Sequence, residues 1–187
     1  SLLNKQLHRL TKQIELTAKL CDNIKSKINT INTCNECKLN EITLSYREEE
    51  YFLVSEDILL SLPLKERFVA AVNLLNSAVD QNGLKEYSIG GFIFNDTITD
   101  FSPESYKVFC KTNKKRHNYI KPYGLYLQIC VNTNFDDAVN TAKPFLTKFC
   151  QALNLKTNNV IYIKILRDYW STDSHNKFIS KIEIPVL

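Results

Sequence analysis

The sequence predicts an α+β protein, with an N-terminal coiled-coil helix over 1–33 and a compact, mainly antiparallel sheet domain with two principal helices over 34–187. Three patterns support this fold class. Apolar residues first recur at alternating spacings of four and three, later at helical spacing in two further stretches, and at a period of two in most of the remainder. With 187 residues, 44% of them apolar and 24% charged, the chain can also build a sizeable core.

The N-terminal segment has an unbroken heptad pattern, and no Gly or Pro interrupts it. Its a and d positions, which we call the seam, are Leu3, Leu7, Leu10, Ile14, Thr17, Cys21, Ile24, Ile28 and Ile31. Such a seam is typical of helices that pair with another chain, so we predict dimerisation through this helix. The facing e and g residues neither attract nor repel strongly, which leaves homodimer and heterodimer open. The alternative is an amphipathic helix that folds onto its own domain.

The first part of the domain is predicted to hold two short strands and a helix. The strands lie within 41–54 and are separated by a charged turn, Arg47 to Glu50. The helix begins at Pro63 and ends at Asn82-Gly83, where glycine can adopt the left-handed cap.

After Gly83 the pattern predicts strands, one more helix and a closing hairpin. Pro144 should kink or split that helix. Gly90-Gly91 lies inside a strand pattern, which favours a bulge or close packing over a phosphate-binding turn. The predicted strands are 86–95, 105–111, 123–132, 159–168 and 177–186, and the helix is 135–154.

Catalytic and metal chemistry find little support in the sequence. The chain has no nucleotide-binding loop, zinc-protease motif or nucleophile elbow, so we predict no enzyme, no catalytic residue and no cofactor. Cys34 and Cys37 have the spacing of half a zinc site, but no second half follows, and we expect no bound metal. Most of the six cysteines fall in apolar patterns, which favours a reducing compartment, nucleus or cytoplasm. No segment is apolar enough to span a membrane.

Two features are candidate partner-binding surfaces. The loop 111–121 carries the densest positive charge, and it can bind nucleic acid, bind an acidic protein or simply be a solvated hairpin tip. Trp170 is either an interface residue or a core residue. The candidate partner-binding residues are Lys111, Lys114, Lys115, Arg116, Tyr119, Lys121 and Trp170.

A rod that ends in a small antiparallel domain resembles the subunits of eukaryotic kinetochore complexes that carry RWD-type domains. The resemblance concerns the layout, and it implies a scaffold in a nuclear assembly. We therefore predict a non-enzymatic coiled-coil adaptor whose domain recognises a protein partner. The alternative is a dimeric nucleic-acid-binding domain that uses the basic loop 111–121.

Overall fold

The computed structural model describes residues 1–81, 89–133, 136–167 and 178–187, and these form two units, Ser1–Cys37 and Lys38–Leu187. The first unit is one helix, α1 (Leu2–Glu36), 35 residues long. Ser1 caps it, because its side-chain oxygen accepts a hydrogen bond from the Asn4 amide at 3.3 Å. The predicted N-terminal helix therefore exists and ends a few residues later than expected.

The seam of α1 is exposed wherever the structure describes its side chains. Leu3, Leu7, Leu10, Ile14, Ile24 and Ile28 are each at least half exposed. Thr17 and Cys21 are exposed as well, and the side chain of Ile31 lies outside the described part. A row of exposed Leu and Ile is costly in water. Pairing of this helix with another helix stays a prediction.

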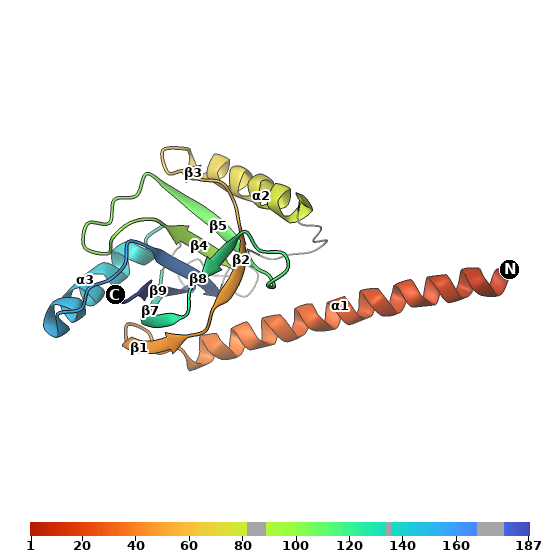
Figure 1. The fold of residues 1–187 in the computed structure, drawn as a ribbon, viewed down its shortest axis with the longest axis horizontal. Helices are drawn as coiled ribbons and strands as arrows, with labels where there is room; N and C mark the ends of the chain where they lie inside the picture. The colour runs from red at the N-terminus through yellow and green to blue at the C-terminus, as the bar shows by residue number, and fades with distance from the viewer. Residues whose placement is uncertain (82–88, 134–135, 168–177) are drawn as a thin grey trace. The chain divides into compact units, whose positions relative to one another are not determined.

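The second unit is built around a curled antiparallel sheet (Figure 1). Its strand order is β1-β7-β9-β8-β4-β5-β2-β6, and β3 pairs with β5 beside this path. The strands are β1 (Ile42–Arg47), β2 (Glu50–Val54), β3 (Ile58–Leu59), β4 (Gly91–Phe94), β5 (Ser105–Lys111), β6 (Tyr119–Lys121), β7 (Gly124–Asn132), β8 (Ile161–Arg167) and β9 (Ile179–Pro185). The α+β class is thus confirmed, and β8 and β9 form the predicted closing hairpin.

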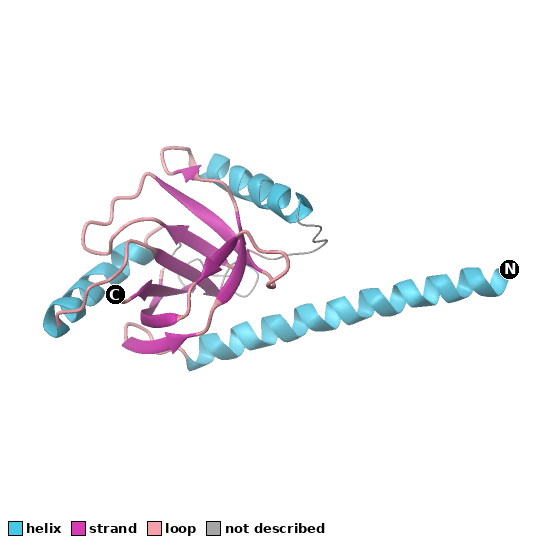
Figure 2. Ribbon diagram, viewed as in Figure 1, coloured by secondary structure: helices cyan, strands magenta, loops and turns pink. Residues whose placement is uncertain are grey.

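One face of the sheet packs against two helices, α2 (Leu64–Gln81) and α3 (Ala138–Leu153) (Figure 2). Alternation along each strand sends Ile, Leu and Val to this face, where they form one core with the apolar stripes of both helices. Pro144 lies inside α3 and does not split it. The predicted helix end at Asn82-Gly83 lies outside the described residues.

The sheet also has an inner face, opposite the helices. Strands β1 and β2, which follow each other in the sequence, lie toward opposite ends of the strand order around this face. The charged turn 47–50 does connect these two strands, but they do not pair with each other: β1 pairs with β7, and β2 with β5 and β6. The segment therefore crosses from one end of the strand order to the other. Strand β6, predicted as part of a loop, completes that far end.

The Gly90-Gly91 pair is explained by close packing, as predicted. A Cβ atom on Gly91 would lie 1.8 Å from the carbonyl oxygen of Ile163, and one on Gly90 would lie 3.0 Å from the Phe109 ring. Gly91 also has a φ of +157°. Only glycine lets β4 and β8 approach so closely with the Phe109 ring beside them.

Candidate functional site

Charged side chains gather on the inner face of the curled sheet. We call this set the inner cluster: Arg47, Glu50, Lys111, Lys121, Lys164, Lys181 and Glu183. Its ion pairs cross the face between strands that are not neighbours. Glu50 on β2 contacts Lys164 on β8 at 2.6 Å, although β5 and β4 lie between these strands. The cluster therefore joins strands that are distant from one another in the strand order.

Glu183 is the most deeply buried member, with 1% of its side chain exposed. Its carboxylate contacts Lys121 at short range, Lys164 at 3.0 Å, Lys181 at 3.4 Å and Arg47 at 3.6 Å. Burial raises the pKa of Glu183, but Lys164 and Lys121 outweigh burial and lower the pKa from 4.5 to about 2. Glu183 is therefore ionised at neutral pH.

Glu50 is the second carboxylate, and it shares two lysines with Glu183. Lys164 lies at 2.6 Å, Lys121 at 3.1 Å and Lys111 at 3.3 Å from its oxygens. Burial again raises the pKa, and Lys164 and Lys121 lower it to about 2. Two ionised carboxylates thus face five cationic side chains.

Lys121 occupies the centre of a cage made by these carboxylates and two tyrosines. It is fully buried, and its ammonium nitrogen lies 4.4 Å from the centre of the Tyr126 ring and 5.2 Å from that of Tyr162. Carboxylates and electron-rich aromatic faces are the groups that attract a cation. Here the protein's own lysine fills that position, although burial lowers its pKa.

The tyrosines are fixed by hydrogen bonds of their own. The hydroxyl groups of Tyr119 and Tyr162 are hydrogen-bonded to each other at 2.8 Å, and Tyr126 donates to the carbonyl of Pro122 at 2.8 Å. Burial raises the pKa of both Tyr126 and Tyr162, so their phenols stay protonated. These rings are thus rigid walls of the cage.

Three buried polar atoms on β1 and β7 make no hydrogen bond: Nε2 of Gln128, Oγ of Ser45 and Nε of Arg47, which lies 3.6 Å from the Glu183 carboxylate. Gln128 is 3% exposed and pairs in register with Glu183 on the neighbouring strand. Its amide oxygen accepts from Nη2 of Arg47 at 2.5 Å, which leaves the amide NH₂ unused. An unmet buried donor costs about 1–3 kcal/mol, so it marks a place where an acceptor group would be stabilising.

The structure separates the residues of the predicted basic loop. Lys114, Lys115 and Arg116 are exposed between β5 and β6, whereas Lys111 reaches back to Glu50. Lys121 was predicted to contact a partner. That prediction is wrong, because Lys121 is fully buried and paired with both carboxylates. Tyr119 is tied to Tyr162, and Trp170 lies outside the described residues.

The sequence reasoning missed Glu50, Lys164 and Glu183, although a signal was present. Lys164 stands between Ile163 and Ile165, and Glu183 between Ile182 and Ile184. A single charge inside an apolar, β-branched strand indicates a charged partner on the same buried face.

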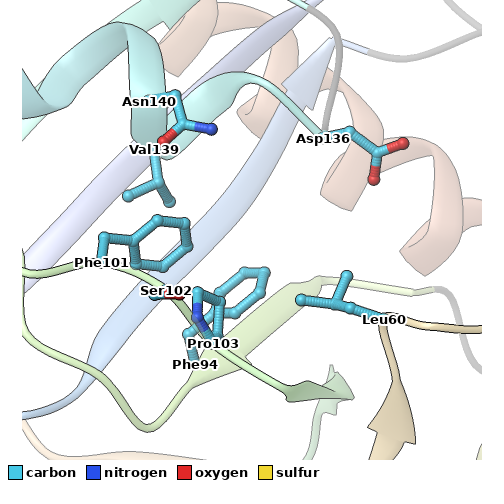
Figure 3. Close-up of a pocket in the computed structure, with 8 residues that line it drawn as sticks. All are labelled: Leu60, Phe94, Phe101, Ser102, Pro103, Asp136, Val139 and Asn140. Atoms are coloured by element: carbon cyan, nitrogen blue, oxygen red, sulfur yellow. The ribbon is translucent and has the colours of Figure 1, made fainter.

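A separate cavity of about 230 Å³ lies on the helix side of the sheet (Figure 3). Leu60, Phe94, Phe101 and Val139 line it, and Asp136 stands at its edge, where it pairs with Arg67 at 3.1 Å. Its lining also includes the polar residues Ser102 and Asn140, and none of its lining residues belongs to the inner cluster. Among the described residues, no group of three or more His, Cys, Asp or Glu could hold a metal ion, and no helix is long and apolar enough to cross a membrane.

Comparison with known proteins gives one curated relative. The multidrug-efflux transporter 2 regulator of Bacillus subtilis is 24% identical over 184 residues, which is 95% of this chain and 65% of that protein. The chain thus spans just under two thirds of its relative's length. No family model matches.

Solved structures share the fold. EcmrR in its complex with DNA has a TM-score of 0.58 at 13% identity, covering 98% of this chain and 70% of EcmrR. The isolated EcmrR C-terminal domain has a TM-score of 0.60 at 11% identity, covering 79% of this chain and 97% of that domain. A protein from Listeria innocua described as a hydrolase has a TM-score of 0.55 at 12% identity, covering 83% and 96%.

These findings overturn the prediction of a nuclear, kinetochore-like scaffold that recognises a protein partner. The matched relative is a bacterial regulator and the matched structure was solved on DNA. The layout of a long helix and a small antiparallel domain was read correctly, but this layout occurs in unrelated assemblies, so the resemblance carried no functional information.

Proposed function

We propose that this chain is part of a bacterial transcription regulator that acts on DNA, with residues 38–187 as its small-molecule sensor. The observation that carries this proposal is a similarity that spans both the helix and the domain. The Bacillus subtilis regulator matches 95% of the chain, and the DNA-bound EcmrR structure matches 98%. Such a protein works in the cytoplasm.

The exposed seam of α1 supports a paired regulator. Two copies joined through this helix would present two DNA-contacting surfaces, and regulators that bind duplex DNA commonly do so as symmetric dimers. The seam residues remain candidates for that contact.

The exposed end of the basic loop is a candidate DNA contact. Lys114, Lys115 and Arg116 are exposed, and exposed cations of this kind bind phosphates through counterion release. The net charge of +4 is consistent with such a contact but does not require it. Since 35% of the relative's length has no counterpart in this chain, DNA contacts beyond this loop are also compatible with the proposal.

The chemistry of the described residues supports binding over catalysis. Both carboxylates of the inner cluster have a pKa of about 2, too low for general acid–base work near neutral pH. Burial raises the pKa of the Cys110 thiol to about 11, which keeps it protonated and inert. The fold is shared with a protein described as a hydrolase, but a shared fold does not transfer an activity.

Selection of duplexes from a random DNA library tests the function. The protein, as its gene encodes it, should enrich a two-fold symmetric sequence, and its affinity should fall as salt rises. Replacing Lys114, Lys115 and Arg116 by Ala should reduce the salt slope if the loop contacts phosphates, while the same change at Lys38, Lys148 and Lys156 serves as the control. A protein that enriches no sequence and retards no duplex would contradict the proposal.

A further inference from the structure

The inner cluster has an excess of positive charge. Within the described part of the chain, five cationic side chains of the cluster face two carboxylates, an excess of three positive charges. The three most exposed side chains of the cluster are all cationic. The side chains of Lys111, Arg47 and Lys164 are 71%, 37% and 23% exposed, whereas those of Glu50 and Glu183 are 17% and 1% exposed. A ligand that enters from solvent therefore meets cations first.

The cation position in this cluster is already filled. Lys121 lies between both carboxylates and against the Tyr126 and Tyr162 rings, where an external cation would otherwise bind. An incoming cation would have to displace a fully buried lysine and would be repelled by Arg47, Lys164 and Lys181. The geometry excludes a simple cationic ligand.

The unused hydrogen-bonding groups are donors. The amide NH₂ of Gln128 and the hydroxyl of Ser45 make no hydrogen bond, and the Nε–H of Arg47 faces Glu183 at 3.6 Å, too far for one. These groups lie on neighbouring strands, β1 and β7. A carboxylate oxygen that accepts from Arg47 and Gln128 would satisfy groups that the protein leaves unsatisfied, and charge-assisted hydrogen bonds of this kind are the strong ones.

Aromatic side chains lie near the donors and the lysines: Tyr126 pairs in register with Ser45, and its ring lies 6.3 Å from that of Tyr162. Tyr119 is half-buried against Tyr162, and it packs on the apolar cluster that contains the stacked rings of Phe52 and Phe109, whose centres are 4.3 Å apart. A flat aromatic body could pack edge-on against Tyr119 while its anionic group reaches the donors.

We propose that the inner cluster binds an aromatic organic anion, such as an arylcarboxylate, and that Lys121 acts as a built-in cation that excludes cationic ligands. The inference rests on the proposed sensor function and names the ligand class of that sensor.

The test compares ligands of equal shape and different charge. Calorimetric titration of the full chain uses three series, naphthyl, biphenyl and indolyl, each as carboxylate, carboxamide and aminomethyl cation. In at least one series the carboxylate should bind about tenfold or more tightly than the cation. A preference for the cation, or no carboxylate bound in any series, would overturn the proposal.

Two variants test the assigned residues. Lys164→Met should weaken carboxylate binding about tenfold, while Lys148→Met, on the exposed side of α3, should leave it unchanged. Lys121→Ala empties the cage and should create binding of the aminomethyl cation. Glu50→Gln, which removes the less buried of the two negative charges, should strengthen carboxylate binding. If Lys164→Met and Glu50→Gln both leave carboxylate affinity unchanged, the ligand binds elsewhere.

DNA binding is measured on the same protein samples. Sequence-specific DNA binding without a carboxylate preference would refute the ligand class and leave the regulator function intact. Carboxylate binding without any DNA binding would refute the regulator function and leave the site intact.

Discussion

Replacement of Lys121 by Met probes the ion-pair network that joins distant strands across the inner face of the sheet. Met keeps the length of the side chain and its contact with Tyr126 but removes the charge between Glu50 and Glu183. Removing one partner of a buried pair typically costs about 3–5 kcal/mol. We expect about 3 kcal/mol, because Lys164, Lys181 and Arg47 still contact Glu183 in the variant.

Urea denaturation measures this cost. With a denaturant slope of about 2 kcal/mol per molar urea, the midpoint should fall by about 1.5 M. Lys111→Met is the matched control, since that side chain is largely exposed and its ion pair should contribute less than about 1 kcal/mol. The double variant Lys121→Met/Glu183→Gln should be more stable than the sum of the single changes predicts, because Glu183→Gln removes the buried charge whose nearest ion-pair partner Lys121→Met takes away. A Lys121→Met protein within about 1 kcal/mol of the wild type would refute the reasoning.

The remaining predictions concern acid, glycine and the helix. Glu50 and Glu183 have a pKa of about 2 in the folded protein against 4.5 for the ordinary side chain, so they stabilise the fold above about pH 4.5, and this stabilisation disappears as the pH falls toward 2. The melting temperature of Glu50→Gln should therefore fall less between pH 4.5 and pH 2 than that of the wild type. An equal fall in both proteins would count against the ion pairs. Gly91→Ala should destabilise the protein by about 3 kcal/mol or abolish folding, whereas Gly124→Ala, whose added Cβ would meet its nearest atom at 4.0 Å, should cost less than about 1 kcal/mol, as urea melts would show. Ile14→Lys with Ile24→Lys should lower the mass measured by light scattering while the domain stays folded; a wild-type protein that is monomeric at high micromolar concentration would contradict pairing through α1.

The elements with strong periodicity could be predicted from the sequence. The heptad spacing gave α1, and alternation gave β5, β7, β8 and β9 with bounds close to those observed. Short elements could not be predicted. Strand β6 has three residues, too few to show a period, and it forms because β2 offers it a partner.

The candidate site could not be assembled from the sequence, because curl brings together residues that are remote in both sequence and strand order. Glu50 and Lys164 are 114 positions apart, and two strands lie between them in the sheet. The sequence pattern predicted that Arg47 to Glu50 form an exposed charged turn, because a local pattern cannot show that the two ends of this segment face the interior. Lys121 was predicted to belong to the basic loop 111–121 for the same reason.

A crystal structure of the protein with 2-naphthoate tests the central claim, that the inner face of the sheet is the ligand site, most directly. We predict that the ring lies against Tyr119 and that the carboxylate accepts hydrogen bonds from Arg47 and Gln128, with Lys121 still in contact with Glu183. Naphthoate bound in the cavity lined by Leu60 and Phe101, or a carboxylate that points to solvent away from Arg47, would contradict the account.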